Sequence, residues 1–165
     1  MILHEQFIGD YARLARPGYY IFGRTVLLDK TISEAIIRGE ILRPCFWQAG
    51  ISHRENMLYL PGLSWLTVRY KRRIPYGGGG NLGVWKSDII KVNGYNEDYE
   101  GWGYEDNDFI LRLRNMGLIS KAAKFQSIVY HLWHEKRPEN HRNKQLLEQK
   151  NNNSSVRCRN GLFKI

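Results

Sequence analysis

Four consecutive glycines at positions 77–80 restrict the possible folds of this chain more than any other feature. A glycine run has no side chains to pack and a large backbone entropy, so it opposes both helix and strand. It also lets the backbone approach another group closely, because no Cβ atom stands in the way. We therefore expect an irregular turn here, with regular elements before and after it.

The residues on both sides of the glycines predict alternating helices and strands. Apolar residues at helical spacing predict an amphipathic helix in 4–18, which Pro17 and Gly18 end, and aromatic and β-branched residues predict one buried strand at 19–28. The other expected elements are an irregular stretch with a helical piece at 44–76, a short strand at 81–85, two short strands or one interrupted strand at 119–134, and a polar helix in 138–150 that fades into a disordered Asn/Ser run.

Three further helices carry recognisable start and stop residues, at 29–40, 86–94 and 105–117. The last of these has its apolar residues on one side, which is typical of a helix packed on a core. The expected starts are Thr31 or Ser33 and Ser87, and the expected ends are Gly39, Gly94 and Gly117. At 165 residues the chain is long enough for one domain with a hydrophobic core.

Charge is distributed unevenly along a chain of net charge +9. Basic residues gather in 69–73 and in 136–165, and such patches attract nucleic acid, anionic lipid headgroups or phosphorylated substrates. A solvated face with a loose tail explains them equally well. Between Lys91 and Arg112 the sequence instead holds six carboxylates and no lysine or arginine.

The sequence predicts a cellular compartment because it excludes a signal peptide, a membrane-spanning segment and a disulfide framework. The N-terminal residues lack the basic flank of a signal peptide, and no apolar run is long enough to span a bilayer. Cys45 and Cys158 fit neither a zinc pattern nor a disulfide framework, which predicts a reducing cytoplasm. We expect a cytoplasmic protein whose basic C-terminal tail makes peripheral contact with the anionic inner face of the membrane.

The acidic stretch combines carboxylates with an aromatic ring. Glu105 and Asp106 begin the predicted helix, where exposed N–H groups and the helix dipole stabilise negative charge, and a capping role alone would explain them. Trp102 lies between two glycines directly before them. A sugar binds where its ring stacks on an apolar face and its hydroxyls donate to carboxylates, and a carboxylate there can act as general base. Asp108 and Arg112, four residues apart, predict a surface ion pair.

A second polar group follows the last predicted strand. The sequence YHLWHE places His131, His134 and Glu135 within five residues. A structural role would explain a single histidine. Two histidines at this spacing predict a contact with a divalent metal ion or a phosphate.

Together, the glycine run with Asn81, the segments NGYNEDY and GWGYED, and HLWH resemble the C-terminal half of the catalytic domain of family 2 glycosyltransferases. The resemblance covers most of 1–137 and is most specific in 77–135, and it points to bacterial enzymes that build lipopolysaccharide or capsule chains. GWGYED is also similar to the Gly-Trp-Gly-x-Glu-Asp segment of chondroitin polymerases and β-1,4-galactosyltransferases. The implied fold is α/β: the C-terminal portion of a GT-A domain, with a Rossmann-like, mixed open sheet.

The resemblance implies a role for each motif residue at the acceptor end. Asp106 would be the base that deprotonates the acceptor hydroxyl, and Glu105 would orient acceptor or base. Trp102 and Gly103 would line the site of the acceptor sugar, and the acceptor would be a saccharide or a lipid-linked saccharide. The implied reaction is an inverting transfer of a sugar from a nucleotide-sugar donor, in cell-surface polysaccharide or lipopolysaccharide synthesis.

At the donor end the resemblance implies contacts with the donor sugar and its diphosphate. The glycine-rich turn with Gly79, Gly80 and Asn81 would border the donor. His131 would coordinate the Mn²⁺ or Mg²⁺ under the diphosphate, and His134 would contact phosphate.

The chain departs from the family pattern in one respect. The family's Asp-x-Asp metal motif and its nucleotide-binding strands would precede residue 1, and the single Asp-x-Asp here, 106–108, belongs to the acceptor motif. We therefore expect 1–137 to be a partial catalytic domain, inactive or weakly active alone, and 138–165 a basic, helical or disordered tail. A non-catalytic carbohydrate-binding remnant is the main alternative. A nucleic-acid-binding module fits less well, because it would place aromatics among basic residues, whereas Trp102 lies among acids.

Overall fold

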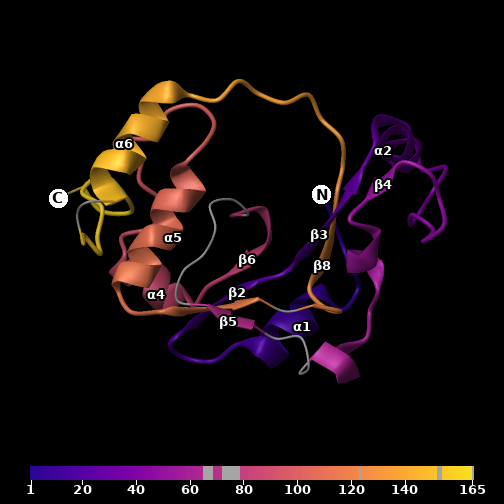
Figure 1. Cartoon of the computed structure of the whole chain (residues 1–165), viewed down its shortest axis with the longest axis horizontal. Coiled ribbons are helices and arrows are strands. Elements are labelled where there is room, and N and C mark those ends of the chain that lie inside the picture. Colours follow the sequence, from indigo (N-terminus) through magenta and orange to yellow (C-terminus); the bar gives the residue numbers. More distant parts are fainter. Residues whose placement is uncertain (65–68, 72–78, 123, 152–153, 165) are drawn as a thin grey trace.

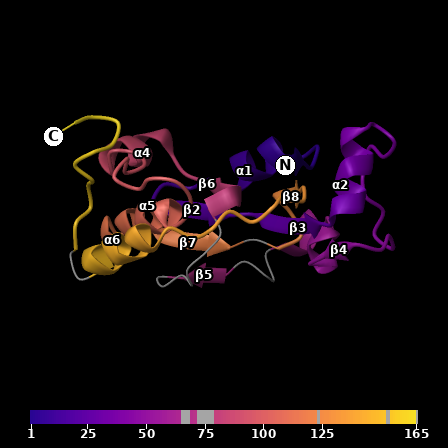
Figure 2. The same ribbon diagram turned by 90° about the horizontal axis from the view of Figure 1, so that it is seen from above.

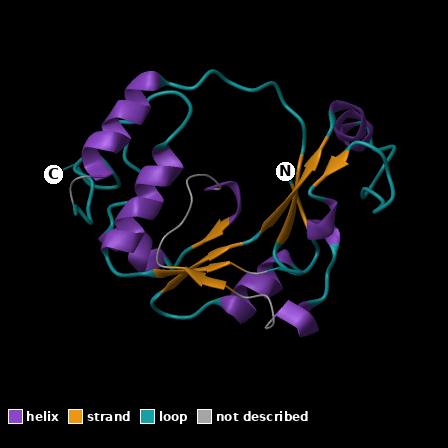
Figure 3. Ribbon diagram, viewed as in Figure 1, coloured by secondary structure: helices purple, strands orange, loops and turns teal. Residues whose placement is uncertain are grey.

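The computed structural model describes residues 1–64, 69–71, 79–122, 124–151 and 154–164, which form a mixed α/β fold (Figure 3). The described strands form two sheets, each containing parallel and antiparallel pairs. One sheet has the order β1 (Ile2–Leu3), β8 (Ile128–His131), β3 (Arg24–Leu28), β4 (Ile51–Ser52); the other has the order β5 (Arg69–Lys71), β7 (Ile119–Ala122), β2 (Tyr19–Phe22), β6 (Leu82–Gly83). This architecture is compatible with a glycosyltransferase domain, and the partial GT-A assignment stays a prediction.

The single strand predicted at 19–28 is wrong, because the chain breaks at Gly23 into β2 and β3, which belong to different sheets. A Cβ atom on Gly23 would lie 2.4–2.5 Å from the side-chain amide of Asn81 and the carbonyl of Ser127. The close approach lets the chain pass from one sheet to the other. The 119–134 region divides in the same way, since β7 pairs parallel with β2 and β8 pairs parallel with β3.

The helices agree with most of the predicted positions. They are α1 (Phe7–Leu14), α2 (Lys30–Ile37), α4 (Lys86–Lys91), α5 (Glu105–Asn115) and α6 (His141–Asn151), with 3₁₀ turns η1 (Arg54–Met57), η2 (Pro61–Leu63) and η3 (Gly79–Asn81). The last two glycines of the run thus enter a short 3₁₀ turn, whereas 77–78 lie outside the described residues. None of the described helices has the length and apolar character needed to cross a bilayer.

The predicted helix ends are confirmed, and α5 begins at Glu105 as predicted, but α2 and α4 are not capped by the residues that the sequence suggested. Gly39, Gly94 and Gly117 have φ values of +78°, +69° and +93°, the left-handed conformation that ends helices. The helix α2 is capped by Asp29, whose carboxylate accepts from the Ile32 amide at 2.9 Å, and not by Thr31 or Ser33. The residue before α4 is Trp85, and Ser87 does not cap this helix because it already lies inside it.

Two hydrophobic cores hold the fold together. One lies between α5 and the second sheet and contains Tyr20, Val92, Phe109, Ile110, Leu113 and Leu118, and Met116 packs against it, which confirms the predicted buried side of α5. The other lies between α2 and the first sheet and contains Val26, Leu28, Ile32, Ile51, Ile128 and Tyr130. The helices α5 and α6 accordingly lie at one end of the molecule, and α2 with β4 at the other (Figures 1 and 2).

An extended segment, 132–140, crosses from β8 to α6, which lies beside α5 (Figure 1). Leu147 of α6 packs in a third cluster with Tyr99 and Leu111. Part of the run predicted as disordered, 152–153, lies outside the described residues, but the Ser155 carbonyl beyond it accepts a hydrogen bond from Asn115 at 3.0 Å. The boundary proposed at 137 stays a prediction.

Candidate functional site

The turn that precedes α5, residues 100–104, has an unusual backbone. Gly101, Gly103 and Tyr104 have φ values of +75°, +106° and +71°. Glycine adopts this conformation without steric cost, whereas Tyr104 stores strain that the surrounding structure must support. The turn leaves Trp102 45% exposed, directly before the carboxylates that begin α5.

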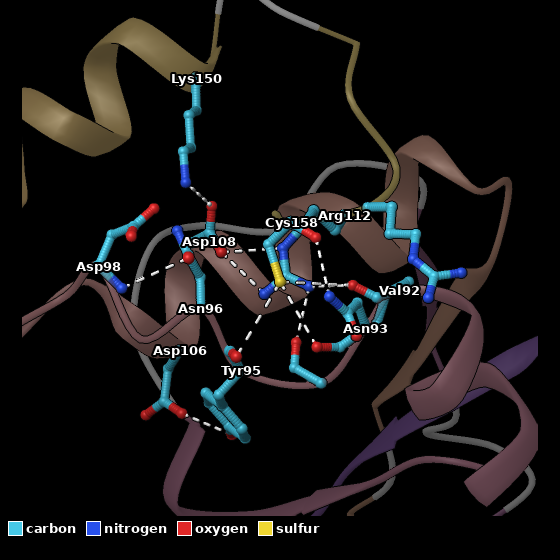
Figure 4. A network of polar contacts seen from close by, with 12 residues as sticks. Val92, Asn93, Tyr95, Asn96, Asp98, Asp106, Asp108, Arg112, Lys150 and Cys158 are labelled. Carbon is cyan, nitrogen blue, oxygen red and sulfur yellow. Dashed lines mark hydrogen bonds and ion pairs between the residues drawn. The ribbon is translucent and has the colours of Figure 1, made fainter. Parts of the chain in front are cut away.

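Asp106 is held by one hydrogen bond. The Tyr95 hydroxyl donates to Asp106 Oδ1 at 2.8 Å, and the Tyr95 ring stacks on Phe109 at a centroid distance of 4.6 Å (Figure 4). Burial and the negative charge of Asp106 raise the pKa of Tyr95, so this hydroxyl stays protonated and acts as a donor. No described residue donates a hydrogen bond to Asp106 Oδ2, so this oxygen can accept one from a ligand.

Glu105 lies half-buried at the first position of α5. Its Oε2 atom is buried and has no hydrogen-bond partner among the described residues. The exposed amides of the first helical turn stabilise negative charge at this position. Because Oε2 is closed to solvent, a hydroxyl that binds beside Trp102 would reach Glu105 through its other oxygen, Oε1.

Two asparagines near the start of α6 hold the 100–104 turn. Asn143 Nδ2 donates to the carbonyls of Glu100 and Gly103 at 3.0 and 2.9 Å, and Asn140 Nδ2 donates to the Glu100 carbonyl at 2.8 Å. Asn143 is only 1% exposed, so these bonds are shielded from water. Neither asparagine could be predicted from the sequence, because nothing in a polar helix about forty residues away indicates a contact with this turn.

The surface ion pair predicted for Asp108 and Arg112 is wrong, because the pair is buried. Asp108 is 0% and Arg112 3% exposed. Their side chains lie 2.8 Å apart, and Lys150 Nζ is 3.6 Å from the second carboxylate oxygen (Figure 4). Arg112 also donates to the carbonyls of Val92 and Gly94, at 2.6 and 2.7 Å. The pair therefore holds the 92–95 turn against α5.

Asn81, at the predicted donor end, is 5% exposed and fully hydrogen-bonded. Its Nδ2 donates to the carbonyls of Arg24 and Ser127 at 3.0 and 2.8 Å, and its Oδ1 accepts from the Tyr11 hydroxyl at 2.5 Å. The side chain thus fixes the break between β2 and β3. Gly80 beside it is exposed. Contacts of Gly79, Gly80 and Asn81 with a donor sugar stay predictions.

His131 and His134 are brought together at the end of β8. Their Nε2 atoms lie 3.1 Å apart, and His134 Nδ1 is 2.9 Å from the Glu135 carbonyl oxygen. Burial lowers the pKa of His131, and repulsion from His134 adds to this effect. The two imidazoles have no third metal-binding partner, since the described residues contain no cluster of three or more His, Cys, Asp or Glu. They do not make a divalent-metal site by themselves.

The acidic pair and the histidine pair lie on the same side of the sheets. Figure 1 shows α5 and β8 on opposite sides of β6, and the 132–140 segment crosses above both of them. Binding of a sugar hydroxyl at the α5 end and of a phosphate at the β8 end stays a prediction.

A hollow beside α1 has a different character. It measures about 500 Å³ and lies between α1, β2 and β6, where Phe7, Ile8, Tyr11, Ile21 and Trp85 are among its lining residues. The lining is almost entirely apolar, so it offers few of the hydrogen bonds that a sugar requires. It shares no lining residue with the start of α5.

Comparisons with known proteins support a relationship to glycosyltransferases. A protein-family profile described as the N-terminal domain of galactosyltransferase matches residues 64–135. Human beta-1,4-galactosyltransferase 2 is 40% identical over 48 residues, which is 28% of this chain and 13% of that protein. Human chondroitin sulfate N-acetylgalactosaminyltransferase 1 is 35% identical over 60 residues, 36% of this chain and 11% of that protein. The matches thus span about an eighth of each relative, and no solved structure matches the chain.

Proposed function

We propose that the chain carries the acceptor side of an inverting glycosyltransferase that uses a nucleoside-diphosphate sugar. The observation that carries the proposal is the arrangement at the start of α5. A half-exposed Trp102 is followed there by the carboxylates of Glu105 and Asp106, and no described residue donates a hydrogen bond to Asp106 Oδ2. This arrangement falls inside the segment similar to galactosyltransferases.

The reaction would need one base. The acceptor sugar stacks on Trp102 and donates one hydroxyl to Glu105. A second hydroxyl gives its proton to Asp106 Oδ2, its oxygen attacks the anomeric carbon from the face opposite the diphosphate, and the carbon–oxygen bond to the diphosphate breaks. The electron pair leaves with the nucleoside diphosphate, which needs no protonation, so one carboxylate is sufficient. The anomeric configuration is inverted.

The names of the two relatives restrict the choice of donor sugar. One is named as a galactosyltransferase and the other as an N-acetylgalactosaminyltransferase, and both sugars have the galacto configuration. We infer that the donor here is galactose or N-acetylgalactosamine linked to a nucleoside diphosphate. Dependence on Mn²⁺ or Mg²⁺, a role in bacterial cell-surface polysaccharide, and a cytoplasmic location beside the membrane stay predictions.

A transfer assay tests the proposal. The protein is incubated with the uridine-diphosphate derivatives of galactose, N-acetylgalactosamine and glucose and with a panel of mono- and disaccharide acceptors, in Mn²⁺, Mg²⁺ or EDTA. Released nucleotide and product mass are measured, and NMR gives the anomeric configuration. We expect weak transfer of a galacto-configured sugar with inversion, and at least a tenfold loss of this activity in Trp102→Ala but not in Trp47→Ala, the matched control at an exposed tryptophan outside the site.

The same assay decides the alternative. A non-catalytic carbohydrate-binding protein would bind saccharides through Trp102 without releasing nucleotide. Saturation-transfer NMR detects such binding directly. Binding that Trp102→Ala abolishes, with no transfer from any donor, would overturn the enzymatic proposal in favour of this alternative.

A further inference from the structure

We propose that Tyr95 is a positioning residue, whose hydroxyl fixes the Asp106 carboxylate so that Oδ2 remains the oxygen that takes the acceptor proton. The inference rests on the proposed function, since it assigns Asp106 the role of base. Its starting point is the 2.8 Å hydrogen bond from the Tyr95 hydroxyl to Asp106 Oδ1 (Figure 4). The terminal torsion of an aspartate is broad, so a carboxylate without such a partner samples many orientations.

The Tyr95 ring is itself held firmly. It stacks on Phe109, one turn further along the same helix as Asp106, with an interplanar angle of 13°. The hydrogen-bond donor, Tyr95, and the hydrogen-bond acceptor, Asp106, are thus both positioned by the same rigid element, α5. Burial and the charge of Asp106 raise the pKa of Tyr95, so the phenol remains a donor across the working pH range.

The backbone around Tyr95 is held in place by the buried ion pair of Asp108 and Arg112. Arg112 donates to the carbonyls of Val92 and Gly94, and Asp108 holds the Arg112 guanidinium. The C-terminal residues close the other side, because Asn93 Nδ2 donates to the carbonyls of Cys158 and Phe163 at 2.9 and 2.8 Å. The turn that bears Tyr95 therefore has little freedom to move away from Asp106.

The hydroxyl is not needed for packing. Tyr95 is 45% exposed, and the stack on Phe109 uses only its ring, so phenylalanine would fill the same space. At a half-exposed position a phenol can satisfy its hydroxyl with water. Its bond to Asp106 thus matters for the carboxylate more than for the fold.

The test compares Tyr95→Phe with wild type in the transfer assay. We expect kcat to fall about tenfold, the effect of one lost hydrogen bond to a charged group, with acceptor KM within about twofold. A phenol hydrogen bond favours the ionised carboxylate, so the acid limb of kcat/KM should move to higher pH in the variant. The other charged groups near this bond, Glu105 and Arg112, are unchanged. Equal kcat and an unmoved acid limb would overturn the proposal.

Tyr99→Phe is the matched control, because the buried Tyr99 phenol interacts with Asp108 rather than with Asp106. It should leave the acid limb in place. A shift equal to that of Tyr95→Phe would show a general structural effect and overturn the proposal.

A measurement without turnover separates this inference from the proposed function. The carboxyl ¹³C resonance of Asp106 is titrated in wild type, in Tyr95→Phe, and in protein with 3,5-difluorotyrosine incorporated at position 95. We expect the midpoint to move to higher pH when the donor is lost and to lower pH when the donor is a stronger acid. Three superimposable curves would overturn the role of Tyr95, whereas shifted curves in a protein without transfer would overturn only the proposed function.

Discussion

Asp106 and Asp108 stand two residues apart in α5, yet their surroundings differ completely. Two residues correspond to about 200° around a helix, so the side chains leave it on opposite faces. Asp106 is half-buried, with one phenol hydrogen bond and one oxygen left to accept a proton. Asp108 is fully buried between Arg112 and Lys150.

This difference shows that one acidic stretch has two roles, one towards a ligand and one in holding the fold. On the face of Asp106 the carboxylate is only half-buried and can meet a ligand. On the face of Asp108 the charge is neutralised inside the protein, and it anchors the turn that carries Tyr95. A substitution on the first face should therefore change chemistry, and one on the second face should change stability.

The largest effect is expected for Asp106→Asn. The amide keeps the shape of the carboxylate but cannot take a proton, so transfer should fall about 10²- to 10⁴-fold. Nucleotide-sugar affinity and the free energy of unfolding should stay close to wild type. Single-turnover kinetics, calorimetric titration of the donor and urea unfolding measure the three quantities. Near-normal turnover would refute the role of Asp106 as base.

For Asp108→Asn we expect a loss of about 3–5 kcal/mol in the free energy of unfolding, because Arg112 is left buried without its counter-charge. Denaturant unfolding measures this loss. Asp98→Asn is the matched control in the same acidic stretch, since Asp98 is exposed and should cost less than about 0.5 kcal/mol. Equal, small losses in both variants would contradict the contrast between the two faces.

A smaller effect is expected at the turn that bears Trp102. Asn143→Ala removes two partly buried hydrogen bonds to the carbonyls of Glu100 and Gly103, each contributing about 0.5–1.5 kcal/mol. The acceptor KM should rise severalfold while kcat changes little, because the base stays in place. Asn115→Ala, which removes one exposed hydrogen bond at the other end of α5, should leave the acceptor KM unchanged. A raised KM in both variants would speak against a specific role for Asn143.

The smallest effect concerns the histidine pair. Because burial lowers the pKa of His131, the unfolded chain binds more protons there, so this contribution to stability is complete above about pH 6.5 and is lost as the pH falls through the lowered value. The melting temperature should therefore fall on acidification from pH 7.5 to 5, and by less in His131→Asn. The exposed His141 provides the control, His141→Asn. Equal decreases in melting temperature between pH 7.5 and 5 for His131→Asn and wild type would contradict the prediction.

The sequence was sufficient where a local rule decides the structure. The helix from Glu105 to Asn115, its buried apolar side and its glycine end follow from helical spacing and from the preference of glycine for positive φ. The same holds for the sharp turn around Trp102, which two glycines indicate. Each of these features depends on residues within about two helical turns of one another.

The tertiary structure alone decided which polar groups are buried and which are free. Asp108 and Arg112 have the spacing of a surface pair, and only the packing of α6 and the C-terminal residues over them removes them from water. Asn81, which a motif assigns to the site of the donor sugar, instead makes its hydrogen bonds at the break between β2 and β3. This break depends on Gly23, 58 residues earlier. Burial and hydrogen bonding join residues distant in the chain, so no local pattern records them.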